Sequence, residues 1–137
     1  MNQVFEQRLG ALHAHVDASV AGGRRGVEKE SLRVTSDGFL AQTPHPAGLG
    51  SALTNRFVTT DFSEALLEFV TPALGSTWEA LQVVCDIHQF VYRQLGDELL
   101  WCASMPCRIP ADADIPLARY GNSKVGRMKT GERVPRY

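Results

Sequence analysis

Residues 57–71 read FVTTDFSEALLEFVT, and this stretch decides the fold that we expect of the chain. The run predicts a strand region with a break near Asp61, and Pro72 and Gly75 end it. Side chains two or four apart on a strand project from the same face. The spacing therefore predicts that Glu64 and Glu68 share a face, with Asp61 just ahead of them.

A second acidic strand is predicted upstream, in the stretch GVEKESLRV. Glu28 and Glu30 are two residues apart, so both carboxylates should project from one face, separated by about 7 Å. Residues 36–38, Ser-Asp-Gly, are a turn signal, and residues 39–41 are the returning strand of a predicted hairpin. Residues 42–55, rich in Gly, Pro, Ser and Thr, predict a loop.

Two helices flank these strands in the predicted order. Residues 3–21 carry apolar side chains at three- and four-residue steps and predict an amphipathic helix, which Gly22 and Gly23 end. A capping box formed by Ser76 and Glu79 begins the other helix. Its predicted apolar stripe consists of Leu81, Val84, Cys85, His88, Val91, Tyr92 and Leu95, and it ends at Gly96.

Residues 99–104 predict a short final strand before Pro106. The order helix, hairpin, strand, helix, strand indicates an α+β fold, an antiparallel sheet with helices packed on one side. The side chain of His88 is expected to pack in the core. Cys107 is interpreted as a small buried residue in preference to a redox-active one.

The composition of the chain excludes some classes of function. The chain has 137 residues, 44% of them hydrophobic and 21% charged, with a formal net charge of -1. Nothing in that balance attracts the chain to nucleic acid or to an anionic membrane. The sequence contains no apolar run of membrane-spanning length and no basic start followed by an apolar stretch, and its three cysteines suit reduced thiols. We therefore expect a cytoplasmic domain with no nucleic-acid or membrane partner.

The acidic strands allow two interpretations. Hard oxygen ligands gathered on a sheet suit Mg²⁺, which in turn neutralises the phosphates of ATP. Alternatively, these acids simply face solvent on a one-sided sheet, which is common. Spacing alone does not decide between them. The sequence contains no G-x-x-x-x-G-K-[ST] loop, so any ATP would be bound without a P-loop.

Four stretches of the sequence decide between these interpretations. They are RGVEKESLRV (25–34), HPAGLGSALTNRFVTTDFSEALLEFVTP (45–72), SMPCRI (104–109) and ARYGNSKVGRMKT (118–130). They resemble the successive amino-terminal motifs of proteobacterial glutamate–cysteine ligases (gamma-glutamylcysteine synthetases), with similar spacing between them.

The resemblance implies an antiparallel sheet similar to that of glutamine synthetase, with the active site on its concave face. The implied reaction joins the γ-carboxylate of glutamate to the amine of cysteine through γ-glutamyl phosphate, at the expense of ATP. The acids that match the family's metal-binding positions are Glu28, Glu30, Asp61 and Glu68. They would hold Mg²⁺ ions that bridge the nucleotide phosphates. Glu64 lies in the motif, but no metal role is carried onto it.

The resemblance implies a partial domain. Residues 1–130 are expected to be the amino-terminal part of an incomplete ligase domain, and residues 131–137 a divergent, disordered tail. Family members are several times longer, so we expect a fragment that is inactive alone. One alternative is a non-catalytic Mg²⁺- or nucleotide-binding module, or a partner-dependent subunit, that retains the carboxylates. Another is a related carboxylate–amine ligase with a different amine acceptor. The sequence gives no oligomeric state.

Overall fold

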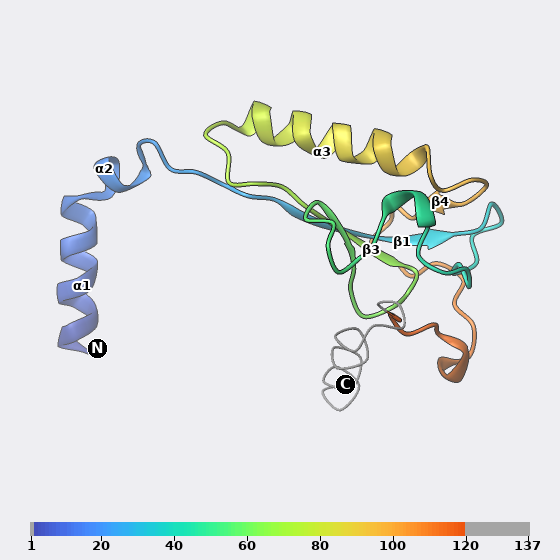
Figure 1. The fold of residues 1–137 in the computed structure, drawn as a ribbon. Helices are drawn as coiled ribbons and strands as arrows, with labels where there is room; N and C mark the ends of the chain where they lie inside the picture. The colour runs from blue at the N-terminus through green and yellow to red at the C-terminus, as the bar shows by residue number, and fades with distance from the viewer. Residues whose placement is uncertain (1, 120–137) are drawn as a thin grey trace.

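The fold of the computed structural model is described for residues 2–119, and its centre is one antiparallel sheet (Figure 1). The strand order is β2-β3-β1-β4, and every neighbouring pair is antiparallel. The predicted α+β class is confirmed. The strands are β1 (Glu28–Val34), β2 (Val58–Thr60), β3 (Leu66–Val70) and β4 (Leu99–Leu100).

The predicted break in the run 57–71 is confirmed. The chain turns between β2 and β3, and these strands then pair with each other. The turn is closed by the amide of Asp61, which donates to the carbonyl of Leu66 at 3.1 Å, and by the amide of Leu66, which donates to the carbonyl of Ser63 at 2.9 Å. The run is therefore a tight hairpin within the sheet.

The expected hairpin after β1 also forms. The amide of Thr35 donates to the carbonyl of Phe39 at 2.8 Å and closes the turn, and Val34 forms an isolated bridge with Leu40. Gly38 sits in this turn at φ +82°, a left-handed conformation that glycine adopts without strain. The last predicted strand is shorter than expected, because only Leu99 and Leu100 of the stretch 99–104 pair, with the end of β1.

The helix α3 (Thr77–Tyr92) begins at the predicted capping box. The hydroxyl of Ser76 accepts from the amide of Glu79 at 3.1 Å, and the Glu79 carboxylate accepts from the amide of Ser76 at 3.0 Å. The predicted end at Gly96 is wrong by one turn, because the helix stops at Tyr92 and Gly96 takes φ +62° in the connection that follows.

The predicted apolar stripe of α3 is only partly correct. Ala80, Ile87 and Val91 are the buried residues, whereas Leu81 is 51% and Tyr92 48% exposed. Apolar residues occupy more than one face of this helix, and the sheet covers only one of them. Periodicity alone therefore placed the stripe too broadly.

The helix α3 lies along one face of the sheet (Figure 1), and the main core packs between them. His88 packs edge-on against the ring of Phe69, with centroids 4.9 Å apart, so the expectation of a packed core histidine is confirmed. Each fully buried large apolar side chain contributes roughly 1.5–3 kcal/mol. The cluster comprises Leu49, Val58, Leu67, Phe69, Ile87, Val91, Leu95 and Leu100.

The amino-terminal segment does not form the single helix predicted over 3–21. It forms α1 (Gln3–Ala14) and α2 (Val16–Val20), separated at His15, whose backbone leaves the helical region. No residue of α1 is buried, and the helix stands apart from the sheet (Figure 1). Its large apolar side chains are exposed, because no other segment of residues 2–119 covers them. Within that same range, no helix is long and apolar enough to cross a membrane.

Candidate metal-binding face

The face of the sheet opposite α3 carries the predicted acids. In the pairing of β1 with β3, Glu30 lies directly opposite Glu68, and Glu28 lies opposite Val70. Glu28 and Glu30 are exposed, and Glu68 is half-buried. Residues of the other parity face α3. Phe69 packs in the core with Ile87 of α3, and the ammonium of Lys29 lies 5.3 Å from the centre of the Phe69 ring.

Asp61 belongs to the same face by its register. Thr59 in β2 pairs with Glu68, and Asp61 follows Thr59 by two residues along the continuing ladder. The register therefore places the four predicted positions along one diagonal of the sheet, with the Glu30–Glu68 pair between Glu28 and Asp61, which follows the end of β2.

The geometry of this face suits a cation held partly by other groups. Directly opposed residues have Cβ atoms about 4.5–5.5 Å apart, so the carboxylates of Glu30 and Glu68 can approach one ion. No group of three or more His, Cys, Asp or Glu side chains in the described part of the chain converges closely enough to hold a metal ion. Mg²⁺ typically binds through one or two carboxylates, with waters and substrate phosphates completing its octahedron, and the residues present fit that pattern.

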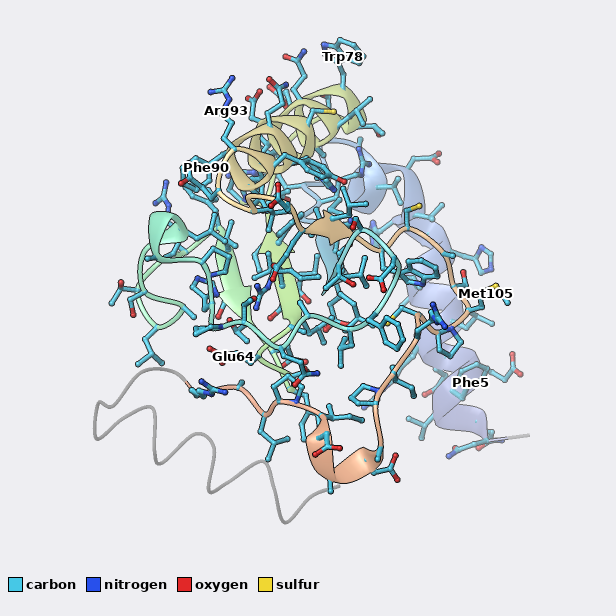
Figure 2. The ribbon with its side chains drawn as sticks, turned by 90° about the vertical axis from the view of Figure 1, so that its right-hand side faces the viewer. Phe5, Glu64, Trp78, Phe90, Arg93 and Met105 are labelled. Atoms are coloured by element: carbon cyan, nitrogen blue, oxygen red, sulfur yellow. The ribbon has the colours of Figure 1, made fainter. Side chains whose placement is uncertain are left out.

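Glu64 lies outside β3, so the expectation that it shares a strand face with Glu68 is wrong. It precedes β3, in the turn between β2 and β3, where the alternation of a strand does not apply. Its side chain is only 4% exposed. The carboxylate accepts the backbone N–H of His45 at 3.0 Å and the backbone N–H of Arg119 at 2.7 Å. Figure 2 labels it below the strands, whereas Trp78 and Phe90 of α3 are labelled above them.

A buried arginine was missed by the sequence reasoning. Arg33 pairs with Glu98 at 2.6 Å, and the side chains of the two residues are 1% and 14% exposed. The guanidinium also donates to the hydroxyl and the carbonyl of Thr43 and to the carbonyl of Glu64. The alternation along β1 could have revealed it, because Arg33 is two and four residues from Ser31 and Lys29 and so shares the face of β1 that turns towards the core.

His45 lies next to this arginine. Its Nδ1 is 2.8 Å from the hydroxyl of Thr60, and its Nε2 is buried with no hydrogen-bond partner among residues 2–119. Burial lowers the pKa of His45, and the charge of Arg33 adds to that effect while the carboxylate of Glu64 opposes it. The imidazole is therefore biased towards its neutral form.

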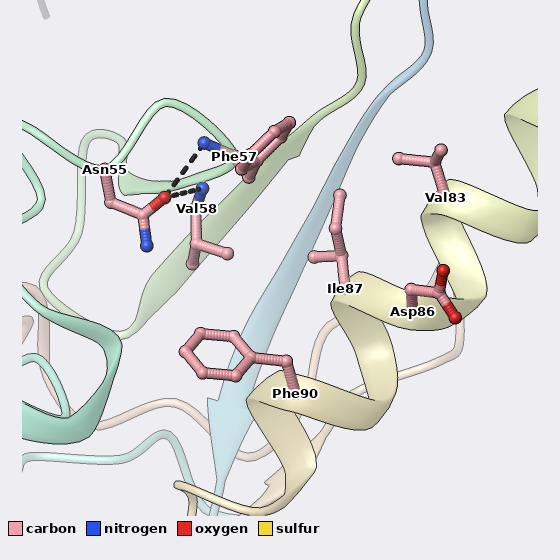
Figure 3. Close-up of a pocket in the computed structure, with 7 residues that line it drawn as sticks. All are labelled: Asn55, Phe57, Val58, Val83, Asp86, Ile87 and Phe90. Atoms are coloured by element: carbon pink, nitrogen blue, oxygen red, sulfur yellow. Dashed lines mark hydrogen bonds between the residues drawn. The ribbon is translucent and has the colours of Figure 1, made fainter.

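An apolar pocket of about 400 Å³ opens between the edge strand β2 and α3 (Figure 3). The side-chain oxygen of Asn55 accepts from the amides of Phe57 and Val58 and shapes its rim. Val83, Ile87 and Phe90 line the helix side. This pocket lies beneath the helix-covered face, so it is separate from the acidic face.

The three cysteines differ in burial. Cys107 is buried, as predicted, and burial raises the pKa of its thiol. Cys85 and Cys102 are exposed. Residues 120–130 of the string at 118–130 lie outside the described residues, as does the expected boundary at 130.

Solved structures share this fold. A glutamate–cysteine ligase from Francisella tularensis in complex with AMP superposes with a TM-score of 0.75 at 42% identity, covering 80% of this chain and 22% of that one. A bifunctional glutathione synthetase from Pasteurella multocida gives a TM-score of 0.69 at 35% identity, covering 91% of this chain and 16% of that one. The sheet, its covering helix and its acidic face are thus part of a glutamine-synthetase-like ligase domain.

Sequence comparison gives the family. The family model described as glutamate-cysteine ligase matches residues 9–135. The chain belongs to the glutamate–cysteine ligase family. A glutamate–cysteine ligase of Alcanivorax borkumensis is 57% identical over 127 residues, which is 92% of this chain. One from Pseudomonas entomophila is 52% identical over 129 residues, or 94% of this chain. The chain spans about a quarter (24%) of the length of each of these relatives.

Proposed function

We propose that this chain supplies the Mg²⁺- and ATP-binding face of a glutamate–cysteine ligase. The reaction joins the γ-carboxylate of glutamate to the amine of cysteine through γ-glutamyl phosphate, the first step of glutathione synthesis. Membership of the family supports the reaction, and the AMP complex of the Francisella tularensis relative supports a nucleotide site. The observation that carries the proposal for this chain is the opposition of Glu30 and Glu68 on the face not covered by α3.

In this proposal the carboxylates of Glu28, Glu30, Asp61 and Glu68 hold Mg²⁺. The bound ion would neutralise the nucleotide phosphates while the γ-phosphoryl group moves to glutamate. The contribution of this chain is to present the acids on strands. The ladder between β1 and β3 sets the separation of Glu30 and Glu68, and the core beneath α3 keeps that ladder rigid.

Metal binding is the first test. The 137-residue chain would be titrated with Mn²⁺, a paramagnetic substitute for Mg²⁺, and free Mn²⁺ measured by electron paramagnetic resonance. We expect saturable binding that Mg²⁺ displaces, weakened at least tenfold in Glu68→Gln. Glu6→Gln on α1, an exposed acid remote from the sheet, is the matched control and should bind as the wild type does. Equal affinity in both variants would remove Glu68 from the site.

Ligation needs the remainder of the domain. The experiment replaces the matching segment of the Alcanivorax borkumensis ligase with this chain and measures ATP-dependent formation of γ-glutamylcysteine. We expect an active chimera, and Glu28→Gln or Glu68→Gln in it should abolish ligation without lowering the melting temperature. Full activity in either variant excludes that residue from the metal site. A folded chimera that binds Mn²⁺ without turnover would favour a non-catalytic binding module, and preference for another amine would contradict cysteine as acceptor.

A further inference from the structure

Glu64 is a buried carboxylate that is not among the ligands of the proposed metal site. Its two oxygens accept main-chain N–H groups from segments far apart in the sequence, His45 at 3.0 Å and Arg119 at 2.7 Å. A carboxylate is costly to bury unless its oxygens are satisfied. Here both oxygens are satisfied by backbone donors, so this side chain joins the loop at 43–46 and the segment at 116–119 to its own turn.

The main chain of Glu64 adds two further attachments. Its amide donates to the carbonyl of Pro116 at 2.7 Å, and its carbonyl accepts from the Arg33 guanidinium at 3.0 Å. Bridging of Ser63 with Leu117 extends the same contact. Every polar group of Glu64 is therefore engaged, and the turn is fixed to β1 and to two other segments.

This turn begins at Asp61, one of the proposed metal ligands. The amide of Asp61 donates to the carbonyl of Leu66, and this bond closes the turn from three residues before Glu64 to two residues after it. A shift of Glu64 would move Asp61 relative to Glu30 and Glu68, which are held separately by the β1–β3 ladder. The position of Asp61 on the acidic face depends on the contacts of Glu64.

We infer that Glu64 is a positioning residue for the metal site, acting through Asp61 without touching the metal. The inference rests on the proposed function. Mg²⁺ demands near-ideal octahedral geometry, so a small displacement of one ligand weakens its binding. Groups that orient metal ligands typically change affinity by about 10- to 100-fold when they are removed.

The substitution Glu64→Gln probes this role without changing the shape of the side chain. One oxygen becomes an NH₂ donor, which then faces a backbone N–H of either His45 or Arg119. One attachment is lost and two donors meet, so the turn must shift. Ser76→Ala is the matched control, because it removes the cap of α3 and lowers stability without touching the turn.

Mn²⁺ affinity of the 137-residue chain would be measured at a temperature well below the melting temperatures of all variants. We expect Glu64→Gln to bind Mn²⁺ about tenfold more weakly. Ser76→Ala should keep the wild-type affinity despite a comparable fall in melting temperature. In the background Asp61→Asn, Glu64→Gln should cause no further loss, because the two residues act as one unit.

The outcomes separate this inference from the function on which it rests. Wild-type affinity in Glu64→Gln overturns the positioning role and leaves the metal site standing. Equal weakening in Glu64→Gln and Ser76→Ala also overturns it, because the loss would follow stability alone. Additive losses in the double variant would show that Glu64 does not act through Asp61. Absence of Mn²⁺ binding by the wild-type chain overturns the proposed metal site, and the positioning role with it.

Discussion

Glu30 on β1 and Glu68 on β3 lie directly opposite each other in an antiparallel ladder, on the face of the sheet that α3 does not cover. Like charges placed directly opposite destabilise a sheet, by an amount comparable to the 0.2–1 kcal/mol that a favourable pair contributes. The pairing of these two acids therefore does not contribute to the stability of the metal-free sheet. A cation between the two carboxylates would turn the repulsion into attraction.

Glu30→Gln should therefore change stability in opposite directions with and without metal. In EDTA the free energy of unfolding is expected to rise by about 0.2–1 kcal/mol, because the repulsion is removed. In saturating Mn²⁺ the variant should gain less stability than the wild type, because a ligand that binds only the folded state stabilises it. Urea denaturation in both conditions measures the two effects. A loss of stability in EDTA, or an equal gain in Mn²⁺, would contradict the pairing argument.

Local physics explains what could be predicted from the sequence. The capping box of Ser76 and Glu79, the turn at Gly38 and the shared parity of Glu28 and Glu30 each depend on residues a few positions apart. Strand alternation alone is enough to place two acids on one face.

What could not be predicted depends on distant partners. The opposition of Glu30 and Glu68 requires the register between two strands, and the Arg33–Glu98 pair joins residues 65 apart in the sequence. Glu64 was assigned to a strand face although it lies in a turn, because alternation was extended beyond the end of β3. These errors share one cause: periodicity describes a segment, whereas register and burial are set by what packs against it.

Breaking the buried ion pair should cost far more than removing it whole. Arg33→Met leaves the carboxylate of Glu98, 14% exposed, without its cation, and we expect a loss of about 3–5 kcal/mol in the free energy of unfolding. The double variant Arg33→Met/Glu98→Gln should recover part of that loss. Urea denaturation of both variants gives the comparison. A single variant within about 1 kcal/mol of the wild type would show that the pair is not stabilising in this setting.

The thiols should differ in reactivity. Cys85 and Cys102 are exposed, whereas Cys107 is buried and its pKa is raised by burial. Because the thiolate is the reactive form, an aromatic disulfide reagent at pH 8 should modify two thiols rapidly and the third only slowly. Unfolding in urea should make all three react at similar rates. Cys107→Ala is the control and should retain both fast phases. Loss of a fast phase in that variant would contradict the assignment.

Acid should destabilise the fold through His45. Burial lowers the pKa of this imidazole below its ordinary value of about 6.5. Below pH 6.5 the unfolded chain therefore binds more protons at this position than the folded one, and the free energy of unfolding rises with pH there. The contribution of neutral His45 to the free energy of unfolding is fully present above pH 6.5. It is lost as the pH falls from 6.5 towards the lowered pKa of the folded state.

The contribution of His45 can be isolated by difference. Urea denaturation at several pH values between 5 and 8 should show a steeper fall on the acid side for the wild type than for His45→Asn, whose amide can still bond the hydroxyl of Thr60. His13→Asn on the exposed helix α1 removes a histidine that solvent surrounds and should leave the wild-type profile unchanged. The difference between the wild-type and His45→Asn curves therefore measures the contribution of position 45. Parallel curves for the wild type and His45→Asn would mean that His45 accepts its proton as easily folded as unfolded.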